Sequence, residues 1–65
     1  MNEIEYLIIA EESYCVQKAW ETWGGSFIKG LSQALLHADP INMKKIHDTW
    51  TDEWNKGLEQ YKKYY

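Results

Sequence analysis

The segment from Gly24 to Pro40 constrains the fold most, because it predicts one short helix with a break at each end. Gly24 and Gly25 interrupt the preceding segment, since glycine has no Cβ to restrict its backbone. Ser26 is expected to cap the helix by accepting a hydrogen bond from a free backbone N–H. At the other end, Pro40 pushes Asp39 out of the α-helical region. The segment therefore predicts short helices joined by sharp turns.

This helix, expected over residues 26–37, carries its apolar side chains on one face. They recur at helical spacing, as Phe27, Leu31, Ala34, Leu35 and Ala38. We expect that face to pack on the rest of the chain. Gly30 costs the helix roughly 1 kcal/mol relative to alanine. It is either tolerated there or allows a neighbouring helix or indole ring to approach closely.

A longer helix is predicted upstream, over residues 2–23. One seam repeats in steps of three and four residues, a spacing typical of packed helices, and comprises Tyr6, Ile9, Ser13, Val16, Trp20 and Trp23. Ile4, Leu7 and Ile8 form a second apolar face. A helix that is apolar on two sides is either central in a core or shared with a partner. A short strand over residues 5–10 is the alternative, because Tyr and Ile favour strands.

Two further helices are predicted downstream. Asp39 is a good N-cap for the third helix, with Pro40 at the first helical position. Its apolar contacts come from Ile41, Met43, Ile46 and Trp50. Thr49 or Thr51 is expected to cap the fourth helix, in which Gly57 interrupts the apolar stripe and residues 62–65 fray. That stripe consists of Trp54, Leu58, Tyr61 and Tyr65.

The chain of 65 residues forms one domain, residues 1–65, and a domain of this size buries only about 60% of its unfolded surface. Cys15 is the single cysteine, so no intrachain disulfide forms. Four Trp, five Tyr and one Phe must supply the core instead. We therefore predict an all-α protein of three or four short helices in a small bundle, with oligomerisation as a second way to bury apolar surface.

The net charge of −3 is unevenly distributed. Residues 1–39 hold six carboxylates and two lysines, whereas residues 40–65 hold four carboxylates and five lysines. Arginine is absent, which weighs against sequence-specific DNA reading because arginine makes the commonest specific contact to guanine. The N-terminus lacks a basic n-region, and the longest apolar run, residues 6–10, is far shorter than a membrane span. We expect a cytoplasmic protein with no membrane partner.

A nucleophile–base set would need Cys15 together with His37 or His47. A catalytic cysteine acts as the thiolate, in an electropositive environment. Glu11 and Glu12 lie one turn before Cys15 and disfavour that charge. We therefore interpret Cys15 as a packed structural residue.

Metal ligation would have to use His37 with Asp39, or His47 with Asp48. Neither pair has the i, i+4 spacing that places two ligands on one helical face, and both histidines fall near helix ends, where capping or solvation is the expected role. The Gly24–Ser26 stretch lacks the pattern of a P-loop. The sequence thus predicts no catalytic, cofactor or metal site, and no enzyme.

Tryptophan is enriched at binding hot spots, and it is also the largest core residue available here. Because tryptophan is seldom fully buried, we expect at least one of the four to show a face to solvent or to a partner. The candidate interface residues are Ile4, Leu7, Ile8, Trp20, Trp23, Trp50 and Trp54.

Residues 24–56 resemble small helical proteins encoded by bacteriophages and prophages. The resemblance rests on Gly24-Gly25-Ser26-Phe27, Leu31, Ala34-Leu35, Ala38-Asp39-Pro40, Ile46, Trp50 and Trp54. That family has no assigned activity, so no functional residue is carried over. The resemblance implies a small accessory protein, made in an infected or lysogenic bacterium, that binds one host or phage protein.

The expected function is that of a non-enzymatic, protein-binding accessory factor acting through an aromatic and acidic surface. Inhibition of a host enzyme or defence complex is one concrete form of it. The alternative is a structural or assembly component that acts as a homo-oligomer. Independently of that alternative, we predict a homodimer or larger oligomer joined through the N-terminal half of the first helix, at Ile4, Leu7 and Ile8. A second alternative, disfavoured by the missing arginines, is a nucleic-acid-associated protein using the lysines of residues 44–63.

Overall fold

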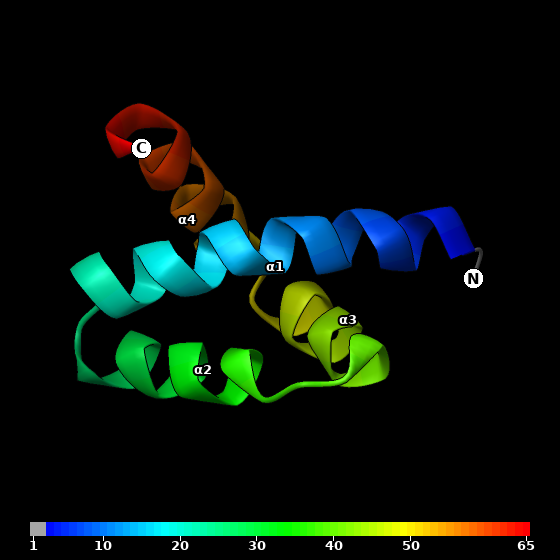
Figure 1. Cartoon of the computed structure of the whole chain (residues 1–65). Coiled ribbons are helices and arrows are strands. Elements are labelled where there is room, and N and C mark those ends of the chain that lie inside the picture. Colours follow the sequence, from blue (N-terminus) through cyan, green and yellow to red (C-terminus); the bar gives the residue numbers. More distant parts are fainter. Residues whose placement is uncertain (1–2) are drawn as a thin grey trace.

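The computed structural model describes residues 3–65, which form four helices joined by short turns (Figure 1). No strand occurs in that part of the chain, so the predicted all-α class is confirmed and the strand over residues 5–10 is wrong. Asn2, the expected start of the first helix, lies outside the described residues. The elements are α1 (Glu3–Trp23), α2 (Ser26–Leu36), α3 (Pro40–Thr49) and α4 (Thr51–Tyr64).

Helix α1 runs the length of the molecule and contacts all three other helices. In Figure 1, α2 runs back antiparallel to the C-terminal half of α1, and α3 lies against its N-terminal half. Helix α4 starts beside α3, crosses α1 and ends on the opposite side of α1 from α2. No helix within residues 3–65 combines the length and apolar character that crossing a membrane requires.

The core lies where α1, α2 and α4 meet. Two indoles fill its centre, with Trp20 of α1 and Trp54 of α4 packed edge to face at 6.1 Å between ring centroids. The predicted seam of α1 is confirmed at Ile9, Ser13 and Val16, which are buried with Trp20. The remaining buried apolar side chains are Ala19, Leu31 and Leu35, surrounded by Ile28, Met43, Ile46, Trp50 and Leu58.

The inward face of α2 differs from the prediction. Leu31 and Leu35 are buried as expected, but Phe27 and Ala34 are exposed, and Ser32 is buried instead. The helix is rotated so that the face centred on Leu35 meets α1. A buried hydroxyl is acceptable there because Ser32 Oγ donates to the Lys29 carbonyl at 2.7 Å. Gly30 lies in open space, so it is tolerated and mediates no close approach.

The joint between α1 and α2 requires glycine at position 24. A Cβ there would lie 2.5 Å from the Trp20 carbonyl oxygen and 2.6 Å from Ile28 Cγ2. The N-cap of α2 is Gly25, and no side chain caps the helix, so the predicted Ser26 cap is wrong. Ser26 is the first helical residue, and α2 ends at Leu36, one residue before the predicted end.

The joint between α2 and α3 is as predicted. Asp39 is the N-cap of α3, and its carboxylate accepts from the Asn42 N–H at 2.8 Å. Pro40 occupies the first turn, where its missing N–H does no harm.

At the last joint, Trp50 is the N-cap of α4, so neither predicted threonine cap forms. The Thr51 hydroxyl instead donates backward to the His47 carbonyl at 2.8 Å, which satisfies a free carbonyl at the end of α3. Helix α4 continues through Gly57 to Tyr64, past the predicted fraying point. Lys62 and Lys63 in its last turn favour this, because cations stabilise a helix C-terminus.

Candidate functional site

The outer face of the N-terminal half of α1 carries three exposed aliphatic side chains, Ile4, Leu7 and Ile8, here called the aliphatic face. Their exposed fractions are 66%, 64% and 50%. They share one side of the helix because they are spaced i, i+3 and i+4. Ile9 points the other way and is buried in the core. Helix α1 is therefore apolar on two sides, and the described residues of the chain cover only one of them.

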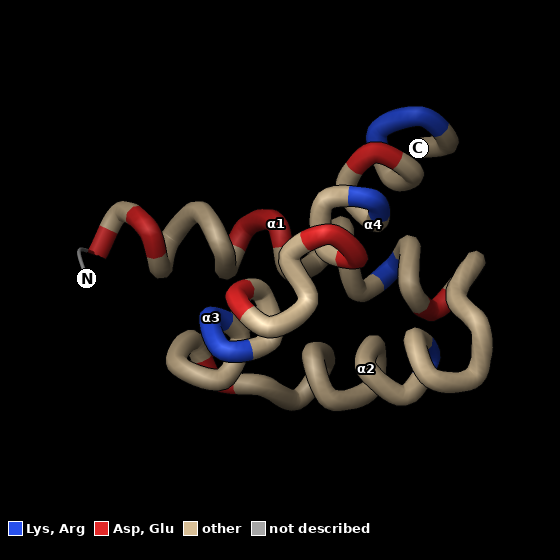
Figure 2. Tube along the Cα trace, turned by 180° about the vertical axis from the view of Figure 1, so that it is seen from behind, with Lys and Arg blue, Asp and Glu red and all other residues tan. Residues whose placement is uncertain are grey.

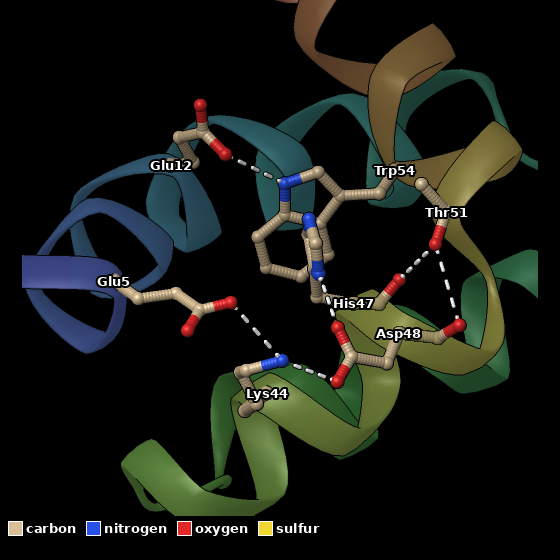
Figure 3. A network of polar contacts seen from close by, with 7 residues as sticks. All are labelled: Glu5, Glu12, Lys44, His47, Asp48, Thr51 and Trp54. Carbon is tan, nitrogen blue, oxygen red and sulfur yellow. Dashed lines mark hydrogen bonds and ion pairs between the residues drawn. The ribbon is translucent and has the colours of Figure 1, made fainter. Parts of the chain in front are cut away.

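Helix α1 is fixed to α3 by an ion-pair network below the aliphatic face (Figure 3). Lys44 of α3 is only 9% exposed, and its Nζ lies 3.3 Å from Glu5 Oε1 of α1. The same ammonium group pairs with Asp48 one turn further along α3. His47 Nδ1 approaches the other Asp48 oxygen at 2.8 Å.

The hydrogen bonds of this network stabilise the charged forms of Lys44 and Asp48. The hydrogen bond to Asp48 raises the pKa of Lys44 above its ordinary value of 10.5, against the opposing effect of burial, and the bond to Glu5 adds to the rise. Hydrogen bonds from Lys44 and then His47 lower the pKa of Asp48 below its ordinary 3.8. Lys44 and Asp48 are thus both ionised around neutral pH.

A second contact fixes α1 to α4. Trp54 Nε1 donates to the Glu12 carboxylate at 3.0 Å, as the dashed line in Figure 3 marks. Glu5 and Glu12 both face inward from α1, one turn on either side of the buried Ile9. These two contacts hold α1 in place, so the aliphatic face is already ordered before a partner binds it.

The carboxylates that remain beside the aliphatic face are Glu3 and Glu11, each one turn from Leu7. Both are exposed, and neither takes part in an ion pair among residues 3–65. Figure 2 shows acidic residues and no lysine along the N-terminal half of α1. The aliphatic face thus has an acidic border.

A shallow hollow of about 550 Å³ adjoins α1 at the start of α3. It is lined by Tyr6, Asp39, Pro40 and Ile41. Ile41 is largely exposed, so apolar surface extends from α1 onto α3.

The four tryptophans divide between core and surface. Trp20 and Trp54 are buried, so their assignment to the candidate interface is wrong: they fill the space between α1 and α4. Trp50 is half-buried, with Phe27 edge-on to it at 6.0 Å. Trp23 is exposed, which confirms that at least one indole shows a face.

A second surface, here called the aromatic end, gathers Tyr14, Trp23, Tyr61, Tyr64 and Tyr65. Trp23 contacts Tyr64 and Tyr65 at centroid distances of 5.2 and 5.8 Å. Tyr65 stacks on Tyr61 at 4.8 Å, and Tyr61 meets Tyr14 edge-on at 6.3 Å. Sequence reasoning named only Trp23 as a candidate here. The i, i+4 pair Tyr61–Tyr65 is the available signal, and spacing assigns it to the apolar stripe of the fourth helix.

The residues considered for chemistry take structural positions. His47 lies edge-on to Trp54 at 5.2 Å, and the Thr51 hydroxyl bonds to backbone carbonyls, not to the His47 ring. Cys15 is half-buried on α1 near Tyr61, and His37 ends α2. Within residues 3–65 no group of three His, Cys, Asp or Glu side chains is placed to hold a metal ion.

Comparison of the chain with protein-family models, with curated proteins and with solved structures found no significant match. The two exposed surfaces, the aliphatic face and the aromatic end, are therefore the features from which function is inferred. The aliphatic face belongs to the N-terminal half of α1, whereas most rings of the aromatic end come from the last turns of α4 and the C-terminal end of α1 (Figure 1).

Proposed function

We propose that this is a non-enzymatic binding protein that inserts the aliphatic face of α1 into an apolar groove of another protein. The exposure of Ile4, Leu7 and Ile8 on a helix whose opposite side is already buried carries the proposal. Hydrophobic grooves of proteins bind amphipathic helices through apolar side chains spaced i, i+3 and i+4. Contiguous apolar surface on a small protein marks an interaction site.

The acidic border specifies the partner further. Glu3 and Glu11 fit a groove rimmed by lysine or arginine, where opposite charges speed association and select the correct partner. A second copy of this chain fits less well. Two α1 helices paired antiparallel about Leu7 would place Glu3 of one copy opposite Glu11 of the other, which is unfavourable.

The resemblance of residues 24–56 to small phage proteins suggests the context: the bacterial cytoplasm, with a host or phage protein as partner. Occupying a basic, apolar groove would block whatever that groove normally binds. Inhibition of a host enzyme or defence complex is the concrete form that we propose.

The test starts with affinity capture from a bacterial lysate and continues with the purified partner. Ile4→Glu combined with Ile8→Glu should weaken its binding at least about a hundredfold, because desolvated apolar anchors dominate interface energies. Leu36→Glu is the matched control, since Leu36 is equally apolar and exposed but lies on α2. Raising the salt concentration should weaken the complex further. Equal affinity of both variants would refute the proposal.

Homo-oligomerisation is the second candidate, because the aliphatic faces of two copies of the chain could bury each other. Salt separates it from the first. Added salt screens the repulsion between acidic borders, so it should strengthen self-association while weakening a basic partner's complex. Sedimentation of the wild-type chain and the Ile4→Glu, Ile8→Glu variant at high and low salt distinguishes the two.

A further inference from the structure

Three tyrosines of the aromatic end expose much of their rings to solvent. Tyr64 and Tyr65 are 61% and 69% exposed, and Tyr14 is exposed to a similar extent. The rings support one another, since Trp23 braces Tyr64 and Tyr65 while Tyr61 stacks beneath Tyr65. A planar ligand would meet rings that are already held in place.

Lysines accompany these rings. Lys18 Nζ lies over the Tyr14 ring, 5.9 Å from its centroid, and Lys63 Nζ lies over the Tyr64 ring at 5.4 Å. A base that stacks on either ring would displace the flexible lysine side chain, which could then contact the adjacent phosphate. Figure 2 shows the lysines of the last turn of α4 at this tip of the molecule. Lys62 belongs to the same turn.

Two hollows flank the rings and share two polar side chains, Lys56 and Gln60. One, of about 290 Å³, also includes Lys63, Tyr64 and Glu59 in its lining. The other, of about 170 Å³, lies at the joint between α1 and α2 and has the Trp23 ring in its wall. Glu53 also lines it, so this surface is mixed in charge but richer in lysine than the acidic half of α1.

We infer that the aromatic end binds single-stranded nucleic acid, with bases stacked on its exposed rings and phosphates held by the lysines around them. Proteins that bind single strands without sequence preference combine these two elements, a cationic track and aromatic side chains. An acidic protein surface would use the lysines but leave the ring faces unused.

The absence of arginine weighs against sequence-specific reading of a nucleic acid, but it does not weigh against base stacking. Arginine is needed for bidentate reading of guanine edges, so the expected recognition tolerates any sequence. Stacking on Tyr or Trp requires only the π face that every base offers. The inference does not rest on the proposed protein partner, because the residues that test it, Tyr64, Tyr65, Lys62 and Lys63, lie at the C-terminal end of α4 and the aliphatic face belongs to α1.

The test is fluorescence anisotropy of a labelled oligothymidine of about 12 nucleotides. The wild-type chain should bind it, and affinity should fall steeply between about 50 and 200 mM salt. Tyr64→Ala combined with Tyr65→Ala should weaken binding at least about fivefold. Phe27→Ala is the matched control, an exposed aromatic residue on α2 that should leave affinity unchanged.

Charge is tested separately. Lys62→Gln combined with Lys63→Gln should weaken binding and flatten its salt dependence, whereas Lys45→Gln, an exposed lysine on α3, should do neither. Circular dichroism establishes that each variant is folded. Three outcomes would overturn the inference. The first is no binding at low salt, and the second is an equal affinity for duplex DNA. The third is that the lysine variant loses binding while the tyrosine variant binds as well as the wild-type chain. If polyglutamate displaces the oligothymidine equally well from the wild-type chain and from the tyrosine variant, the inference is overturned and an acidic protein is the better ligand.

Discussion

Gly57 of α4 lies directly against the indole of Trp20 in α1. A Cβ at position 57 would be 3.1 Å from Trp20 Nε1 and 3.4 Å from Val16 Cγ1. The indole is held where it is, because its Nε1 donates to the Glu53 carbonyl at 3.1 Å and its ring packs on Trp54. The missing side chain thus lets α4 cross α1 closely.

Gly57→Ala should therefore lower stability, although alanine favours a helix by about 1 kcal/mol over glycine. The Trp20 indole is buried and held by its hydrogen bond to the Glu53 carbonyl and its packing on Trp54, so moving away from the added methyl group would disturb both contacts. Gly30→Ala is the matched control, since no atom lies near its Cβ position, and it should raise stability by about 0.5–1 kcal/mol. Urea unfolding followed by circular dichroism measures both. A stabilising Gly57→Ala would contradict the packing described.

Two adjacent leucines of α2 should respond differently to truncation. Leu35 is buried against α1, so Leu35→Ala should cost roughly 2–5 kcal/mol. Leu36 is more than half exposed, and Leu36→Ala should change stability by less than about 0.5 kcal/mol. Similar costs in a denaturant titration would mean that α2 is rotated differently on α1.

The cap of α3 predicts a side-chain-specific effect. Asp39→Ala removes the acceptor of the Asn42 N–H and should cost about 0.5–2 kcal/mol. Asp39→Asn keeps an acceptor oxygen and should cost much less. Thermal unfolding of the two variants decides, and equal losses would show that the charge matters instead of the hydrogen bond.

The Lys44 network predicts a defined pH window. Because the folded-state pKa of Asp48 is lowered, its contribution is present above pH 3.8 and is lost as the pH falls through the folded value. The folded-state pKa of Lys44 is raised, so the stability that Lys44 contributes is present below pH 10.5 and is lost as the pH rises through that folded-state pKa. Lys44→Met should therefore lower Tm most between these limits. Lys45→Met, the exposed neighbour, should show no such window, and a pH-independent effect of Lys44→Met would contradict the network.

Local signals predicted the helices well, because Gly24-Gly25 and Asp39-Pro40 act through their own backbone geometry. Caps were harder to predict: the N-cap of α2 is Gly25, one residue before its predicted cap Ser26, and the Thr51 hydroxyl bonds to the His47 carbonyl at the end of α3. The predicted inner face of α2 is rotated relative to the observed one, because periodicity alone does not distinguish a face centred on Leu31 from one centred on Leu35. The side chains exchanged by that rotation were Phe27 and Ser32.

Of the two surfaces, the aliphatic face could be predicted from the sequence and the aromatic end could not. Ile4, Leu7 and Ile8 are close in sequence, so their shared face could be predicted from spacing alone. The aromatic end joins Tyr14 and Trp23 to the last turns of α4, and only the crossing of α1 by α4 brings them together. Spacing alone therefore assigns Tyr61 and Tyr65 to the apolar stripe of α4, and it cannot show that they meet Tyr14 and Trp23.

Site-specific photo-crosslinking from position 7 tests the proposed use of the aliphatic face most directly. Leu7 lies at its centre, so a photoreactive residue there should cross-link to a second protein, at apolar residues bordered by lysine or arginine. The same residue at Gln33, exposed on α2, should give no such product. Cross-links only to another copy of this chain, or equal products from both positions, would contradict the account.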